Sequence, residues 1–105
     1  MTLYDYKRQA MNTARYKDRE TQLTCAALGL CGEAGEVAEK VKKHYRDGTE
    51  LDGEAVAKEL GDILWYIASM SDCLGFSLDD IARMNIEKLA SRQERGVIAG
   101  SGDDR

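Results

Sequence analysis

The chain has 105 residues, a formal net charge of −4 and no proline. A chain of this length forms one domain with a moderate core, and such chains often complete their core by pairing with a second copy. The acidic balance argues against a nucleic-acid partner, because gripping a phosphate backbone requires a basic stripe. The charged N-terminal residues and the absence of a long apolar stretch exclude a signal peptide and a membrane partner, which predicts a soluble cytoplasmic protein.

Apolar residues recur at steps of three and four along most of the chain, which predicts an all-α fold. We expect the first helix over about residues 2–16, because Thr2 and Asp5 have the spacing of a capping box. The second helix is expected over about residues 21–45, with Gly48 as its stop signal.

The second half of the chain carries equally clear helix boundaries. Asp52 is a good N-cap for a third helix that ends near Gly75. Ser77 and Asp80 form another capping box, which opens a fourth helix that extends to about Arg92. Four helices of these lengths are typical of antiparallel neighbours in a bundle.

Two of the expected helices carry apolar seams, which we interpret as core stripes that pack against other helices. In the second helix the seam consists of Leu23, Ala27, Leu30, Ala34, Val37 and Val41. In the third helix it consists of Val56, Leu60, Ile63, Ile67 and Leu74. The three cysteines, Cys25, Cys31 and Cys73, contain no C-x-x-C pair and are expected to be reduced, buried residues on helices.

Two acidic pairs lie beside these seams. Glu33 and Glu36 are three residues apart on the second helix, and Glu59 and Asp62 are three apart on the third, so each pair projects from one helix face. If the helices pack antiparallel through their seams, both pairs line one groove. Four converging carboxylates repel each other, and hard divalent ions such as Mg²⁺ or Mn²⁺ would relieve this repulsion and attract phosphates. The alternative is a solvated helix face without a ligand.

Glycines surround the acidic pairs, at Gly29, Gly32, Gly35 and Gly61. Each costs a helix about 1 kcal/mol relative to alanine. The absent side chains would allow a metal or a phosphate to approach closely, or would allow two helices to pack tightly. Both explanations are open at this stage.

Several polar residues are candidates for substrate contacts. Lys43 follows Glu36 by seven residues and could reach a phosphate. On the fourth helix, Asn85, Lys88 and Arg92 recur at steps of three and four and form a polar, basic stripe, which could also be a solvated face. Tyr66 follows Asp62 by four residues and therefore lies beside the carboxylates.

The stretch "GLCGEAGEVAEKVKK" followed by "KELGDILWYIA" resembles the MazG-like, all-α nucleoside triphosphate pyrophosphohydrolases. Their signature is E-x-x-E on one helix and E-x-x-D on the next, and "NIEKLASR" is similar to their Asn-x-x-Lys element. The family often has a glutamate directly before the first motif, where this chain has Gly32. The resemblance implies hydrolysis of a nucleoside triphosphate to its monophosphate and pyrophosphate.

The resemblance also implies a four-helix bundle-type subunit completed by dimerisation, sometimes as a tetramer, over a single domain of residues 1–105. Residues from about 94 to 105 would form a flexible or docking tail. Mg²⁺, with Mn²⁺ as a substitute, would be held by Glu33, Glu36, Glu59 and Asp62, and Glu36 would also accept the proton of the attacking water. Phosphates would be held by Lys43, Asn85, Lys88 and Arg92, and Tyr66 would contact the sugar or base. The alternatives are a non-catalytic helical dimer that binds nucleotide or a protein partner, and a phosphohydrolase that removes a terminal phosphate.

Overall fold

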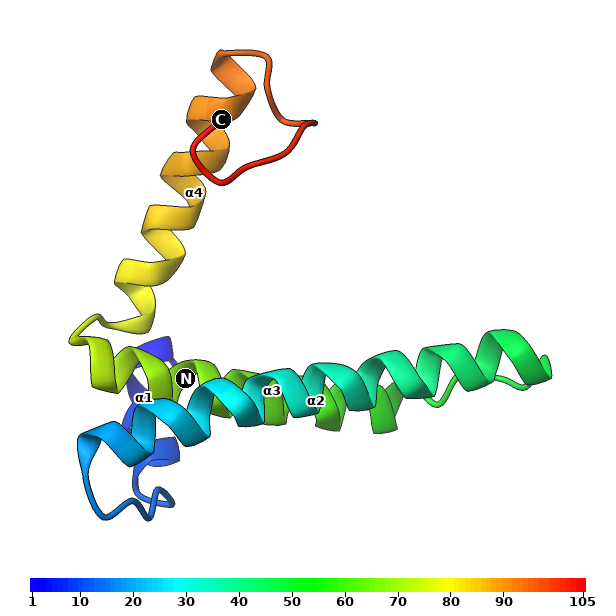
Figure 1. The fold of residues 1–105 in the computed structure, drawn as a ribbon, viewed down its shortest axis with the longest axis horizontal. Helices are drawn as coiled ribbons and strands as arrows, with labels where there is room; N and C mark the ends of the chain where they lie inside the picture. Colours follow the sequence, from blue (N-terminus) through cyan, green and yellow to red (C-terminus); the bar gives the residue numbers. More distant parts are fainter.

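The computed structural model describes residues 1–105 and contains four helices and no strand, which confirms the all-α prediction (Figure 1). The helices are α1 (Leu3–Met11), α2 (Arg19–Asp47), α3 (Gly53–Leu74) and α4 (Leu78–Glu94). None of them combines the length and the apolar composition needed to cross a bilayer.

The predicted helix boundary signals are present in the structure. Thr2 caps α1 by accepting from the Asp5 N–H at 3.0 Å, and Ser77 caps α4 by accepting from the Asp80 N–H at 2.9 Å. Both are complete capping boxes. Two glycines in the left-handed region, which favours glycine, terminate α2 and α3. They are Gly48 with φ 66° and Gly75 with φ 76°.

The first helix ends five residues before the predicted Tyr16. The Thr13 hydroxyl donates to the Ala10 carbonyl at 2.7 Å, and the Trp65 indole N–H of α3 donates to the Thr13 Oγ1 at 2.8 Å. The Thr13 hydroxyl satisfies the Ala10 carbonyl, and the backbone N–H groups of residues 12–14 bond to the carbonyls three residues before them, so the last carbonyls of α1 have partners without a further α-helical turn. A contact from a distant helix therefore fixes where α1 stops.

Helices α2 and α3 form a long antiparallel hairpin, and α1 packs near its open end (Figure 1). Small residues on α2 allow the two long helices to approach, because Ala26 has no exposed area and Gly29 lies against the Tyr66 ring of α3. The Gln22 amide of α2 donates to the Ser69 carbonyl of α3 at 3.1 Å. Helix α4 leaves the hairpin at a steep angle and contacts only α1 and α3, so the chain has the shape of an L.

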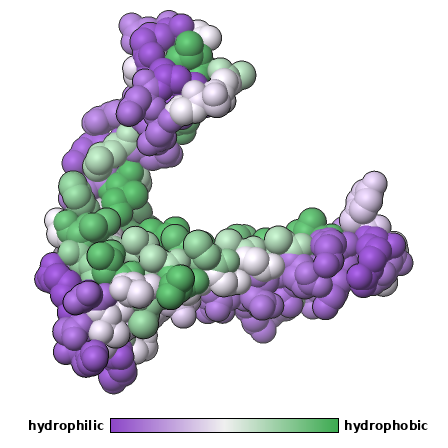
Figure 2. Space-filling model, in the orientation of Figure 1, coloured by the Kyte–Doolittle hydropathy of each residue, from purple (hydrophilic) through white to green (hydrophobic).

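The condition that α2 and α3 pack through their two apolar seams is not met along the whole hairpin. Helix α2 faces α3 with the side that carries Gln22, Gly29 and Glu33. The seams lie to the side and are half exposed, as the exposed fractions of Leu60 (52%) and Val41 (44%) show. Figure 2 shows an apolar band along the hairpin that continues onto the inner side of α4.

Little of the protomer is buried. Only 8 of the 105 residues are fully buried, and the radius of gyration is 16.5 Å. A compact domain of this length has a radius of gyration of about 13 Å. Of the three cysteines expected in the core, Cys73 is buried, whereas Cys25 and Cys31 are exposed, and all three are free thiols. One copy of the chain therefore has an open form with a small core.

Candidate active site

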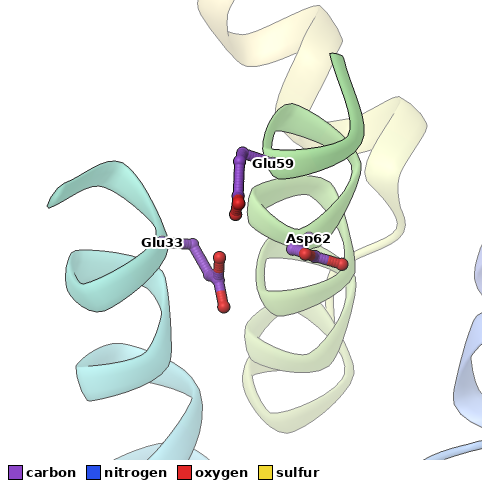
Figure 3. Close-up of side chains that lie close together, drawn as sticks. All are labelled: Glu33, Glu59 and Asp62. Carbon is purple, nitrogen blue, oxygen red and sulfur yellow. The ribbon is translucent and has the colours of Figure 1, made fainter. Parts of the chain in front are cut away.

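Three of the four predicted acidic residues meet between α2 and α3. Carboxylate oxygens of Glu33, Glu59 and Asp62 lie within 4.8 Å of one another. Glu33 and Glu59 point into the space between the helices, and Asp62 projects from the next turn of α3 (Figure 3). Glu33 and Glu59 are half-buried and Asp62 is exposed. The i, i+3 spacing on α3 and the close antiparallel approach of α2 bring these groups together.

The electrostatics of this group are those of crowded like charges. The pKa of Glu33 is raised, chiefly by a hydrogen bond to Glu59, then by partial desolvation, and then by the negative charge of Asp62 and its neighbours. A hydrogen bond between two carboxyl groups requires a proton on one of them. The nearest paired cation is Lys40, whose Nζ lies 3.9 Å from the Glu59 Oε1. One lysine leaves the three acids with a net negative charge.

Glu36, the fourth predicted acid, is exposed and does not belong to this group of three. It lies one turn further along α2, and its charge contributes to the raised pKa of Glu33. The structure therefore places Glu36 at the edge of the acidic group rather than within it.

The glycines beside the acids have different surroundings. A Cβ on Gly29 would lie 2.3 Å from two ring atoms of Tyr66, whereas a Cβ on Gly32, Gly35 or Gly61 would meet nothing within 4 Å. Tight helix packing therefore explains Gly29, which admits the Tyr66 ring against α2. The other three glycines leave open space on the protomer surface.

Two aromatic side chains form one wall of the acidic site. Glu33, Asp62, Trp65 and Tyr66 line an open hollow of about 370 Å³. Trp65 and Tyr66 pack edge to face, with ring centroids 5.1 Å apart. Tyr66 was predicted beside the carboxylates, whereas Trp65 was not among the predicted site residues. The signal for Trp65 was its position three residues after Asp62, which is on the same helical face.

Helix α1 also approaches this site. The pKa of Tyr6 is raised, first by desolvation and second by the negative charge of Asp62. The negative charge of Asp62 therefore acts on the Tyr6 phenol of α1.

The predicted phosphate ligands are not gathered around the acids in one protomer. Lys43 lies ten residues beyond Glu33, which is about 15 Å along the helix axis, and it pairs with Glu39 at 3.7 Å. Helix α4, which carries the stripe, extends away from the hairpin (Figure 1). Within that stripe Asn85 is exposed, Lys88 is half-buried and Arg92 is buried.

The donor set of the acidic site suits a hard divalent cation. Three carboxylates within reach of one another supply oxygen ligands, which Mg²⁺ and Mn²⁺ prefer. The site contains no histidine or cysteine ligand, so it is unsuited to zinc. A divalent charge would also offset the repulsion that raises the pKa of Glu33.

Comparisons with known proteins identify a family for this arrangement. Residues 20–97 match the family model described as the MazG nucleotide pyrophosphohydrolase domain. The chain is 41% identical over 109 residues to the Gene 37 protein of Mycobacterium phage L5, in an alignment that covers 95% of this chain and 96% of that protein. No solved structure gives a significant match. The residues matched by the family model include every acid of the site described above.

Proposed function

Because the chain belongs to the MazG nucleotide pyrophosphohydrolase family, we propose that it hydrolyses a nucleoside triphosphate, (d)NTP, to (d)NMP and pyrophosphate in a Mg²⁺-dependent reaction. The observation that carries this proposal is the convergence of Glu33, Glu59 and Asp62 between two helices. Removal of noncanonical nucleotides from the cytoplasmic nucleotide pool is the role that this reaction would serve.

In this proposal the acids bind the metal ion and accept a proton, and the neighbouring aromatic residues contact the nucleotide. Glu33, Glu59 and Asp62 hold the ion, which when bound would neutralise phosphate charge and make a water molecule more acidic. Glu36 is exposed beside them, and its carboxylate accepts the proton that the attacking water loses. Trp65 and Tyr66 present ring faces and edges next to the acids, where a base or sugar can pack.

The phosphate-binding cations must come from elsewhere in the assembly. Helix α4 carries Asn85, Lys88 and Arg92, but it does not contact α2 in its own protomer. A second copy that covers the apolar band of the hairpin with its α4 would bring this stripe toward the acids. The small core and the half-exposed seams support such a homodimer, since pairing would bury apolar area that one copy leaves in water. A homotetramer would repeat this arrangement.

A nucleotide screen tests the reaction. The parent protein with Mg²⁺ or Mn²⁺ is offered canonical and modified nucleoside triphosphates, and monophosphate and pyrophosphate are measured. Glu59→Gln and Asp62→Asn should abolish pyrophosphate release, whereas Glu54→Gln, on the same hairpin but paired with Lys58 at 3.7 Å, should retain it. Release of orthophosphate instead of pyrophosphate would refute the proposed bond cleavage. If the parent hydrolyses none of these nucleotides, the result would favour a helical dimer that binds nucleotide without catalysis.

Subunit mixing tests the shared site. Glu59→Gln and Lys88→Gln are each expected to be inactive alone. If acids and cations come from different copies, random mixing gives half heterodimers with one intact site each, which restores about a quarter of the parental activity. No recovery after mixing, with heterodimers demonstrated by mass spectrometry, would show that each site uses residues of one copy.

A further inference from the structure

The segment after α4 folds back along that helix (Figure 1). We call residues 97–105 the strap. Gly96, with φ 72°, reverses the chain at the end of α4. Within the strap, the Arg105 guanidinium donates to the carbonyls of Val97 at 3.0 Å and Gly102 at 2.7 Å. The strap is therefore a defined turn rather than an extended tail.

The strap places one carboxylate on the two cations of α4. Asp103 Oδ1 lies 2.7 Å from the Lys88 Nζ and 3.2 Å from the Arg92 Nη2. The Arg92 Nη2 also donates to the main-chain carbonyl of Asp103. Lys88 and Arg92 are four residues apart and share a helix face, so one anionic group bridges both of them.

The exposure of the three partners is unequal. The side chain of Arg92 is 7% exposed and that of Lys88 is 38% exposed, whereas that of Asp103 is 80% exposed. The Arg92 Nε is buried and has no hydrogen-bond partner. The carboxylate therefore leaves part of the buried guanidinium unsatisfied, and solvent reaches the carboxylate from outside.

We propose that the strap is an autoinhibitory element, in which Asp103 occupies the Lys88 and Arg92 cations that substrate phosphates must bind. This inference rests on the proposed function, because that function assigns phosphates to these two residues. A triphosphate carries more charge and more acceptor oxygens than one carboxylate, so it displaces Asp103 and also offers an acceptor to the Arg92 Nε. The strap then raises the concentration of phosphate ligand needed for half-saturation and does not block the cations permanently.

Binding of inorganic tripolyphosphate to the full chain, measured by calorimetry in metal-free buffer, tests the strap. Asp103→Asn should bind about two- to fivefold more tightly than the parent, which is the gain expected when a solvent-exposed ion pair no longer competes. Asp104→Asn is the matched control, because it removes the same charge from the neighbouring residue, which has no ion-pair partner. Lys88→Gln should bind more weakly than the parent.

Equal affinities for Asp103→Asn and Asp104→Asn would overturn the proposal, and so would unchanged binding by Lys88→Gln. A second readout follows the strap itself: the ¹H–¹⁵N nuclear Overhauser effects of Gly102 and Asp103 should fall as tripolyphosphate is added to the parent. A strap that stays rigid at saturation would also overturn it. Pyrophosphate release in the nucleotide screen is independent of these results, so failure of the proposed reaction and failure of the strap are distinguishable.

Discussion

Replacing Gly29 by alanine tests the contact that brings the two acidic helices together. The new Cβ would lie 2.3 Å from Tyr66 ring atoms, which is a distance that requires the ring or the helix to shift. The ring has little freedom, because it packs edge to face on Trp65 at 5.1 Å. Alanine gains about 1 kcal/mol of helix propensity over glycine, but overpacking costs about 1–3 kcal/mol. We expect the variant to be destabilised by about 0–2 kcal/mol overall.

Gly32→Ala is the matched control for this experiment. It lies one turn further on the same helix, and its Cβ would meet nothing within 4 Å. It should therefore gain the full propensity term of about 1 kcal/mol. The two alanine variants should then differ in free energy of unfolding by about 1–3 kcal/mol, which is the overpacking cost alone.

Urea unfolding followed by circular dichroism at one fixed protein concentration measures this difference, since assembly would otherwise contribute to the apparent stability. A smaller side chain in the Tyr66→Leu background should relieve the overlap and turn Gly29→Ala from neutral or destabilising to stabilising. Equal stabilisation by Gly29→Ala and Gly32→Ala in the parent background would refute the packing explanation of this glycine.

Three further predictions concern charge, metal and assembly. The folded-state pKa of Glu33 is raised, so the free energy of unfolding should be highest below the ordinary value of 4.5 and should fall as the pH rises above it through the folded-state pKa. Glu33→Gln should be more stable than the metal-free parent at about pH 7 and equal to it below pH 4.5. Thermal melts with an equal difference at both pH values would contradict this. Mg²⁺ at about 100 times its Kd should raise the free energy of unfolding of the parent by about 2.7 kcal/mol, with little effect on Asp62→Asn; identical melts with and without Mg²⁺ would exclude a metal site. Leu60→Glu, on the exposed seam, should lower the mass measured by light scattering to that of one copy, and an unchanged mass would show that this seam is not the interface.

Local signals explain why most of the fold was predictable. The capping boxes at Thr2 and Ser77 and the left-handed glycine at Gly48 act through residues only a few positions away, so the sequence displays them directly. The end of α1 was not predictable in this way. It depends on the bond from the Trp65 indole to Thr13, which joins residues 52 positions apart.

The meeting of three of the four acids could be predicted from their spacing, but the packing of the helices that carry them could not. The spacing of Glu59 and Asp62 required them to share a face, and the structure brings both to Glu33. Periodicity does not state which face of one helix meets which face of another, however. Here the close approach at Gly29 and Tyr66 turned the acids inward and left the apolar seams at the side. The direction of α4, which has few contacts within its own protomer, could not be read from spacing either.

The small number of buried residues has a consequence for how much protein a cell must contain. With only 8 buried residues, a single copy has few interior contacts to hold its helices together. If the proposed homodimer forms, folding and pairing would become one equilibrium, and dilution would shift it toward unfolded single chains. The activity per chain should consequently fall at low protein concentration, because a smaller fraction of the chains would be folded and paired.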